Sequence, residues 1–183
     1  MRPILIALAM LLALPALAQA PSPHVGLTDR PIRALSAEQQ ADLLAGRGMG
    51  LALAAELNGW PGPAHVIELV SAMRLTPAQF AATQRLMAEM QAAAGSLGAR
   101  LIEEERALDT AFRDRSITPA DLSVRIARIA VLQGEIREVH LRTHLAQAAV
   151  LNVEQIDAYS GLRGHAGGTP QHGGAMPGGH RHQ

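Results

Sequence analysis

Apolar side chains recur at helical spacing through the middle of the chain, from residue 75 to residue 151. A turn at residues 114–117 divides this stretch into two arms, and a turn this short makes the arms antiparallel neighbours. The apolar positions of each arm follow one helix face, so the pattern predicts a long helical hairpin. They are Phe80, Met87, Met90, Ala94, Leu101, Leu108 and Phe112 in the first arm, and Leu122, Ile126, Ile129, Ile136, His140 and His144 in the second.

Two helix starts carry the same kind of pentad, Leu-Thr-Pro-Ala-Gln at residues 75–79 and Leu-Asn-Val-Glu-Gln at residues 151–155. In each pentad the second residue can cap the helix, and the closing glutamine completes a capping box. The leading leucine is placed for a hydrophobic staple with an apolar residue inside the helix. These cap and staple residues are Leu75, Thr76, Gln79, Leu151, Asn152 and Gln155.

Shorter helices precede the hairpin. Ser36 and Gln39 form another capping box, and the helix that follows should bend or break at the glycines of residues 46–50. Glycine and proline at residues 58–63 predict a turn, after which a short helix is expected over residues 64–73.

Gly98 and Gly134 lie at similar distances on either side of the hairpin turn. They either bend both arms into a curved hairpin or let neighbouring helices approach closely. With either role, the predicted fold class is all-α, a long antiparallel hairpin with shorter flanking helices.

The two ends of the chain differ in composition from the helical domain at residues 36–164. Residues 1–20 have the positive start, apolar run and small residues of a secretory signal peptide, with cleavage favoured after Ala18. An uncleaved anchor is the alternative, although a membrane span needs about 20 apolar residues. Proline-rich residues 21–35 should be irregular. Residues 165–183 are rich in glycine, proline and histidine without apolar periodicity, which predicts a disordered tail.

The paired pentads resemble the Leu-Thr-x-x-Gln motifs of the Spy/CpxP family. The first pentad matches at all three motif positions, and the second has Asn152 in place of threonine, which keeps the capping chemistry. The family comprises periplasmic, all-helical proteins, among them ATP-independent chaperones, stress regulators and heavy-metal-resistance sensors. The resemblance implies a periplasmic location, a thin cradle-shaped antiparallel dimer and a concave face that holds clients.

Composition limits the function classes. The sixteen basic residues, all arginine, balance sixteen acidic ones, so no electrostatic argument favours nucleic acid as a partner. The chain has no cysteine, and its sequence lacks a nucleophile elbow, a phosphate loop and a zinc-protease helix, so we do not expect an enzyme. Aromatic residues are only 2% of the chain. A lone hairpin then has little surface to bury, and we expect a homodimer.

Metal-ligating side chains concentrate at one level of the predicted hairpin. Two histidines share a face of the second arm, and symmetric folding about the turn places them opposite two methionines. Thioethers beside imidazoles favour copper, Cu(I) above all, although imidazoles also bind Ni²⁺ and Zn²⁺. A histidine and a glutamate of the preceding short helix can join only if that helix packs back. The alternative is that all are packed interface residues and core filler. The residues are His140, His144, Met87, Met90, His65 and Glu68.

The tail carries further imidazoles, at His165, His172, His180 and His182. Imidazoles on a flexible chain bind Ni²⁺, Cu²⁺ or Zn²⁺ loosely, which suits buffering better than a fixed site. The alternative is a solubilising tail with incidental affinity.

The acidic run Glu103, Glu104 and Glu105 is expected to be a solvated face that pairs with neighbouring arginines. Of the three, Glu105 falls on the apolar stripe, where it would meet Arg128 across the hairpin.

These observations lead to three functional hypotheses. The first is a periplasmic ATP-independent chaperone-like protein, a homodimer that holds unfolded or stressed envelope proteins on mixed apolar and arginine surface. The second is a periplasmic heavy-metal-binding sensor or resistance protein with histidine and methionine ligands, which requires no further cofactor and communicates with a membrane sensor protein. The third is a structural helical adaptor.

Overall fold

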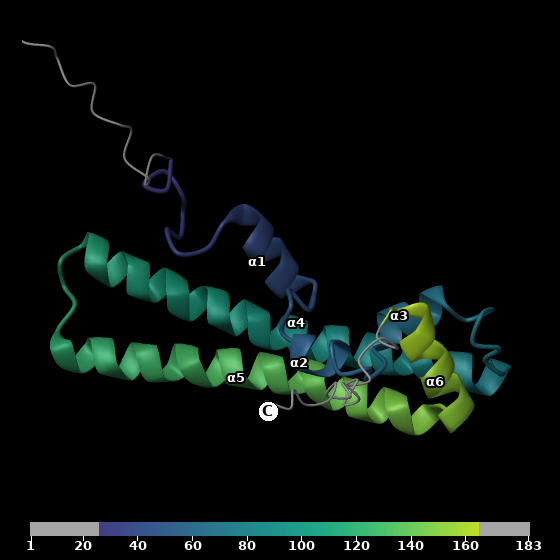
Figure 1. Cartoon of the computed structure of the whole chain (residues 1–183). Coiled ribbons are helices and arrows are strands. Elements are labelled where there is room, and N and C mark those ends of the chain that lie inside the picture. The colour runs from purple at the N-terminus through teal and green to yellow at the C-terminus, as the bar shows by residue number, and fades with distance from the viewer. Residues whose placement is uncertain (1–25, 165–183) are drawn as a thin grey trace, which may run out of the picture.

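The computed structural model describes residues 26–164, which form helices and no strand (Figure 1). The all-α class is therefore confirmed. None of the described helices is long and apolar enough to cross a membrane. The predicted signal peptide and the histidine-rich tail lie outside the described residues. The helices are α1 (Ala37–Leu44), α2 (Leu53–Glu56), α3 (Pro63–Glu68), α4 (Pro77–Arg113), α5 (Pro119–Val150) and α6 (Val153–Leu162).

α4 and α5 pack side by side as the predicted antiparallel hairpin (Figure 1). The side chain of Thr76 accepts a hydrogen bond from the Gln79 N–H at 3.2 Å, and Thr118 accepts one from Asp121 at 3.2 Å. Both helices also begin with proline, where no backbone N–H is needed. The turn between them reverses direction through Arg115, whose φ of 54° lies in the left-handed region.

The two pentads meet at the open end of the hairpin. The side-chain amides of Gln79 and Gln155 exchange two hydrogen bonds, at 2.8 and 3.1 Å, and we call them the glutamine pair. Gln79 also donates to the Val150 carbonyl at 3.0 Å, and Gln155 to the Met73 carbonyl at 3.3 Å. Each glutamine closes its own capping box as well. The pentads therefore stabilise both their own helix starts and the contact between helices.

The main core lies where α1 packs across the middle of the hairpin. Two glycines of α4 let the backbone of α1 come close. A Cβ on Gly98 would overlap the Leu43 carbonyl, and one on Gly95 would lie 2.7 Å from the Leu44 carbonyl oxygen. By contrast, a Cβ on Gly134 would meet nothing within 4 Å. Gly98 therefore allows the backbone of α1 to approach α4 closely. The buried side chains are Ile32, Leu43, Ala94, Leu101, Ile102, Ile129, Leu132 and Ile136.

A second buried cluster at the open end of the hairpin joins α3 and α6 with the residues just before α4 and α6. It comprises Val66, Met73, Leu151 and Tyr159. α3 ends at Glu68, earlier than the predicted helix over residues 64–73, and the chain continues to α4 through turns.

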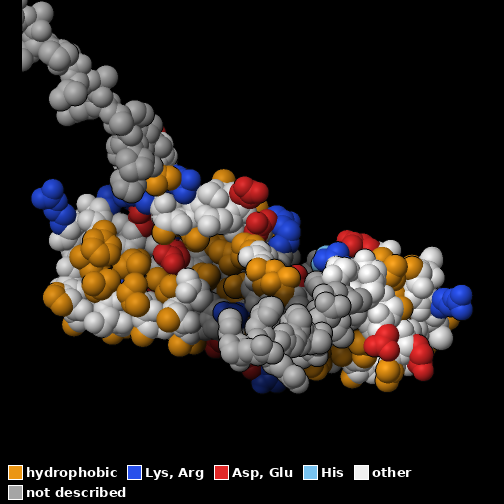
Figure 2. Space-filling view, viewed as in Figure 1, with side chains coloured by type: hydrophobic (Ala, Val, Ile, Leu, Met, Phe, Trp, Pro, Cys, Tyr) orange, Lys and Arg blue, Asp and Glu red, His pale blue; other side chains and the backbone are white. Residues whose placement is uncertain are grey.

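The tip of the hairpin, which we define as residues 103–128, has no buried side chain. Two residues predicted for the buried face are exposed there, Phe112 by 53% and Ile126 by 48%. The prediction was wrong for them because two helices bury only the seam between them, and α1 covers the middle of the hairpin instead of the tip. The Arg33 N–H does donate to the Asp109 carboxylate at 3.2 Å. Figure 2 shows the apolar surface that results, at the left of the molecule.

The acidic run departs from expectation at one contact. Glu103 pairs with Arg106 on the solvated face, as predicted. Across the hairpin, however, Arg128 lies 3.7 Å from Glu104, not Glu105. Adjacent helical residues point in directions about 100° apart, and Arg128 is on the side that Glu104 faces. Glu105 is half-buried, and burial raises the pKa of its carboxyl.

Candidate metal centre

Five of the six candidate ligands in the helical domain line one cavity of about 450 Å³. The cavity lies between the hairpin and the segment that includes α2, α3 and the loop before α2. The hairpin brings the two histidines of α5 and the two methionines of α4 to this cavity, as symmetric folding about the turn predicts. The walls are residues 46–49, Ala52, Glu56, residues 62–65, Met87, Met90, Gln91, His140 and His144.

His144 is held in the tautomer that leaves Nε2 available as a ligand. The side chain is 4% exposed, and Nδ1 lies 3.0 Å from the Trp60 carbonyl oxygen. Because a carbonyl can only accept, Nδ1 carries the proton, and Nε2 of the neutral ring keeps its lone pair. Metal-ligating histidines are typically oriented by such a bond. Gly62 makes room for the ring, since a Cβ there would lie 2.6 Å from His144 Cε1.

His140 has an imidazole nitrogen without a partner. The side chain is 2% exposed, and its Nε2 is buried with no hydrogen bond to any part of the chain that the structure describes. Leaving such an atom unpaired costs about 1–3 kcal/mol. Burial, and then the neighbouring His144, lower the pKa of His140, while Glu56 acts in the opposite direction. The ring is therefore neutral at pH 7, which is the form that binds metals.

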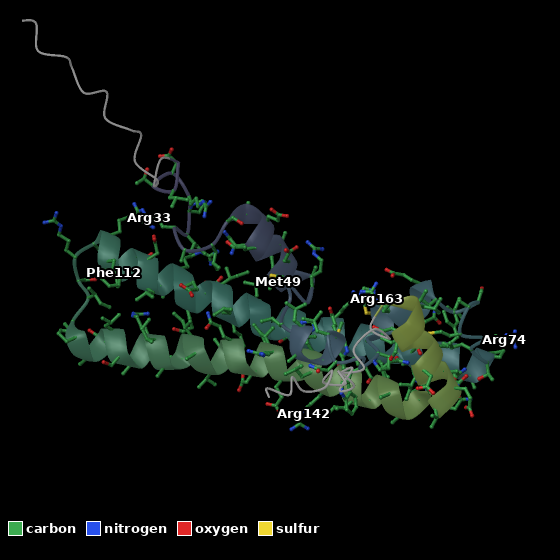
Figure 3. The ribbon with its side chains drawn as sticks, viewed as in Figure 1. Arg33, Met49, Arg74, Phe112, Arg142 and Arg163 are labelled. Atoms are coloured by element: carbon green, nitrogen blue, oxygen red, sulfur yellow. The ribbon has the colours of Figure 1, made fainter. Side chains whose placement is uncertain are left out.

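Three methionines line the same cavity as the two imidazoles. Met87 and Met90 are half-buried on α4 and line the cavity. Met49, in the loop between α1 and α2, also lines it and is 44% exposed. Figure 3 shows Met49 where this loop reaches α4. Sequence reasoning did not identify Met49, because a loop residue belongs to no periodic pattern.

His65 and Glu68 occupy different positions relative to the cavity. α3 does pack back onto the hairpin, so His65 lines the cavity, whereas Glu68 is absent from its walls. His65 Nδ1 lies 3.2 Å from the Glu68 carboxylate, and its Nε2 lies 3.2 Å from the Arg163 guanidinium. Both ring nitrogens of His65 already have partners, so His65 is a wall residue and not a free ligand.

Glu56 is the carboxylate that the structure places beside the histidines, with Oε1 3.9 Å from His144 Nε2. Within residues 26–164, no group of three or more histidine, aspartate or glutamate side chains is placed to hold one metal ion. In the sequence, the closely spaced glycines of residues 46–50 were the one feature that could have indicated that the loop before α2 packs closely against α4 and lines the cavity. A Cβ on Gly46 would overlap the Gln91 backbone, so the loop must approach α4 closely.

The cavity is therefore lined by two imidazoles, thioethers and one carboxylate. Comparisons with protein-family models, curated proteins and solved structures find no match for this chain, so its resemblance to the Spy/CpxP proteins rests on the two pentads.

Proposed function

We propose that this chain is a periplasmic metal-binding protein of the Spy/CpxP type, acting as a heavy-metal sensor or resistance protein. The observation that carries the proposal is the histidine pair on α5. His140 has a buried, unpaired Nε2, and His144 is fixed in the tautomer that leaves its Nε2 available. A metal ion bound by both imidazoles would satisfy the unpaired nitrogen and occupy the cavity that both histidines line.

Metal binding would couple the hairpin to the segment packed against it. The histidines belong to α5, while the facing walls include the loop before α2 and the start of α3. A ligand present at 100 times its dissociation constant stabilises the binding conformation by about 2.7 kcal/mol. That energy is enough to change how firmly the α1–α2 segment is held, and a membrane sensor protein would read this change.

The experiment is a calorimetric titration of the full chain with Zn²⁺, Ni²⁺, Cu²⁺ and, without oxygen, Cu(I). The tail imidazoles at positions 165, 172, 180 and 182 are first replaced by glutamine, so that they do not contribute. We expect one site per chain that His140→Ala or His144→Ala abolishes. His65→Gln is the matched control, because its nitrogens already have partners. Absence of binding, or binding that survives both alanine variants, would refute the proposal.

A second candidate function is ATP-independent chaperone activity, which the exposed tip favours. Phe112, Val124 and Ile126 are exposed by 53%, 51% and 48% on a part of the hairpin without a third layer. Arginines lie among them, and mixed apolar and charged surface suits weak contact with unfolded or stressed envelope proteins. Suppression of the aggregation of a heat-unfolded reporter should weaken in Phe112→Ser/Ile126→Ser. Leu145→Ser, at an exposed position of α5 away from the tip, should leave it unchanged.

We further propose that two copies associate through the apolar surface of the hairpin. A two-helix layer leaves its outer faces uncovered, and pairing would bury them. Sedimentation at micromolar concentration should give a dimer, and a monomer at that concentration would contradict this part of the proposal.

A further inference from the structure

The cavity is lined by three methionines as well as by histidines. Met87 and Met90 on α4 and Met49 in the loop before α2 all line it, together with His140 and His144. Thioether sulfur is a soft, uncharged donor that selects Cu(I) over Zn²⁺ and Ni²⁺. We infer that the cavity is a site for a soft monovalent cation, Cu(I), with the two imidazoles and the methionine thioethers as donors. This inference rests on the proposed metal-binding function and identifies the ion that the site binds.

The charge of the walls supports a monovalent ion. Glu56 is the one acidic side chain that lines the cavity, and it remains 30% exposed; the basic Arg47 also lines the cavity. A buried dication needs compensating anions, because an uncompensated charge in a low-dielectric site is costly. Among the described residues, Glu56 is the one carboxylate on the cavity wall, and the third imidazole there, His65, has partners at both ring nitrogens. Uncharged thioether sulfurs and a single carboxylate suit a single positive charge better than a double one.

Met49 is held toward the cavity by an unusual backbone. Its φ of 44° is in the left-handed region, which is strained for a side chain other than glycine or asparagine. The loop is anchored on α4 at Gly46, where a Cβ would overlap the Gln91 backbone, and it passes His140 at Gly48, whose Cβ position is 3.8 Å from His140 Nδ1. A strained residue directly after these two contacts indicates a function for its side chain. Coordination by Met49 would tie the loop to the hairpin.

The test compares Cu(I) with divalent ions on the same variants. Cu(I) affinity is measured anaerobically by competition with the chromophoric chelator bicinchoninate, and Zn²⁺ and Ni²⁺ affinities by calorimetry, on the full chain with glutamine at the four tail histidine positions. Met87→Leu/Met90→Leu keeps the side-chain volume and both imidazoles. Its Cu(I) affinity should fall by at least about tenfold, since even the loss of an outer-sphere partner weakens metal binding that much. Met49→Leu should also weaken Cu(I) binding.

Met73→Leu is the matched control, because Met73 is 3% exposed in the second cluster and does not line the cavity. X-ray absorption of the Cu(I) complex should show sulfur in the coordination sphere, and the double leucine variant should lose that signal. Equal Cu(I) affinity in the parent and the double leucine variant would overturn the inference.

The outcomes separate the inference from the proposed function. If Zn²⁺ or Ni²⁺ binds through His140 and His144 while Cu(I) does not, the metal-binding function stands and the Cu(I) inference is wrong. If no metal binds, both fail. If Cu(I) binds tightly and only the methionine and histidine variants of the cavity lose it, both are supported.

Discussion

Gly98 and Gly134 lie in the interiors of the two hairpin arms, but their surroundings predict opposite effects of alanine. Alanine in place of glycine inside a helix is favourable by about 1 kcal/mol. A Cβ on Gly134 meets nothing within 4 Å, so Gly134→Ala should stabilise the protein by about 0.5–1 kcal/mol. A Cβ on Gly98 would lie 2.7 Å from the Leu43 carbonyl carbon and 3.1 Å from Leu43 Cβ, and Gly98→Ala should destabilise.

The size of the Gly98→Ala effect follows from what α1 can do. Overpacking costs about 1–3 kcal/mol, and the upper part of this range applies because the obstructing group is backbone, which cannot rotate away. Complete release of α1 would expose Leu43 and Ile32, which are 5% and 0% exposed, at about 1.5–3 kcal/mol each. A shift of α1 is therefore cheaper than its release. After the helix-propensity gain is subtracted, the net loss should be about 1–2 kcal/mol.

The assay is urea denaturation of the parent and both variants, followed by circular dichroism, with hydrogen exchange to locate the change. Gly98→Ala should lower the free energy of unfolding and speed the exchange of α1 amides, while Gly134→Ala should raise the free energy of unfolding. If Gly98→Ala stabilises as much as Gly134→Ala, α1 does not rest on α4 at this position, and the reasoning is refuted. A loss in both variants would show that Gly134 is not open.

Three further predictions concern other parts of the molecule. Glu105→Gln should stabilise the protein at pH 7, because burial raises the Glu105 pKa and so disfavours its charged form. The protonated carboxyl's contribution to the free energy of unfolding is fully present below about pH 4.5 and is lost as the pH rises through the folded-state pKa. The stability gained by the glutamine variant should therefore disappear in acid. The measurement is urea denaturation of the parent and of Glu105→Gln across this pH range. Gln155→Leu should lower the free energy of unfolding by about 1–3 kcal/mol, since the Gln79 amide loses its buried partner, and an unchanged urea midpoint would contradict the glutamine pair. If residues 1–18 are a signal peptide, mass spectrometry of the protein produced in a bacterium should find a chain that begins after Ala18, whereas an intact N-terminus would favour the anchor.

The hairpin was predictable because the signals that specify it act over a few residues. Capping by Thr76 and Thr118 and the helical spacing of apolar positions need no knowledge of the rest of the fold. The presence of Met87 and His144 at one cavity then follows from the position of the turn. The pairing of Gln79 with its partner did not follow, since it depends on how α6 returns to the hairpin.

The position of α1 could not be predicted, because it depends on a backbone contact between residues far apart in sequence. The sequence around Gly98 does not indicate that the Leu43 carbonyl of α1 packs against it. For this reason Phe112 was assigned to a buried face that has no cover. Met49 and Glu56 were missed because they lie in a glycine-interrupted segment where neither helical nor strand periodicity applies.

The glutamine pair fixes the register of the two arms at the open end of the hairpin, while the turn joins them at the tip. Gln79 contacts the end of α5 directly through the Val150 carbonyl. An insertion in one arm alone would rotate all residues on its tip side by about 100° per residue relative to the other arm. Insertions or deletions in related chains should therefore occur in both arms together, in steps of about seven residues or two turns, on the tip side of the cavity. Related chains would then differ in hairpin length while the cavity stays at a constant distance from the glutamine pair.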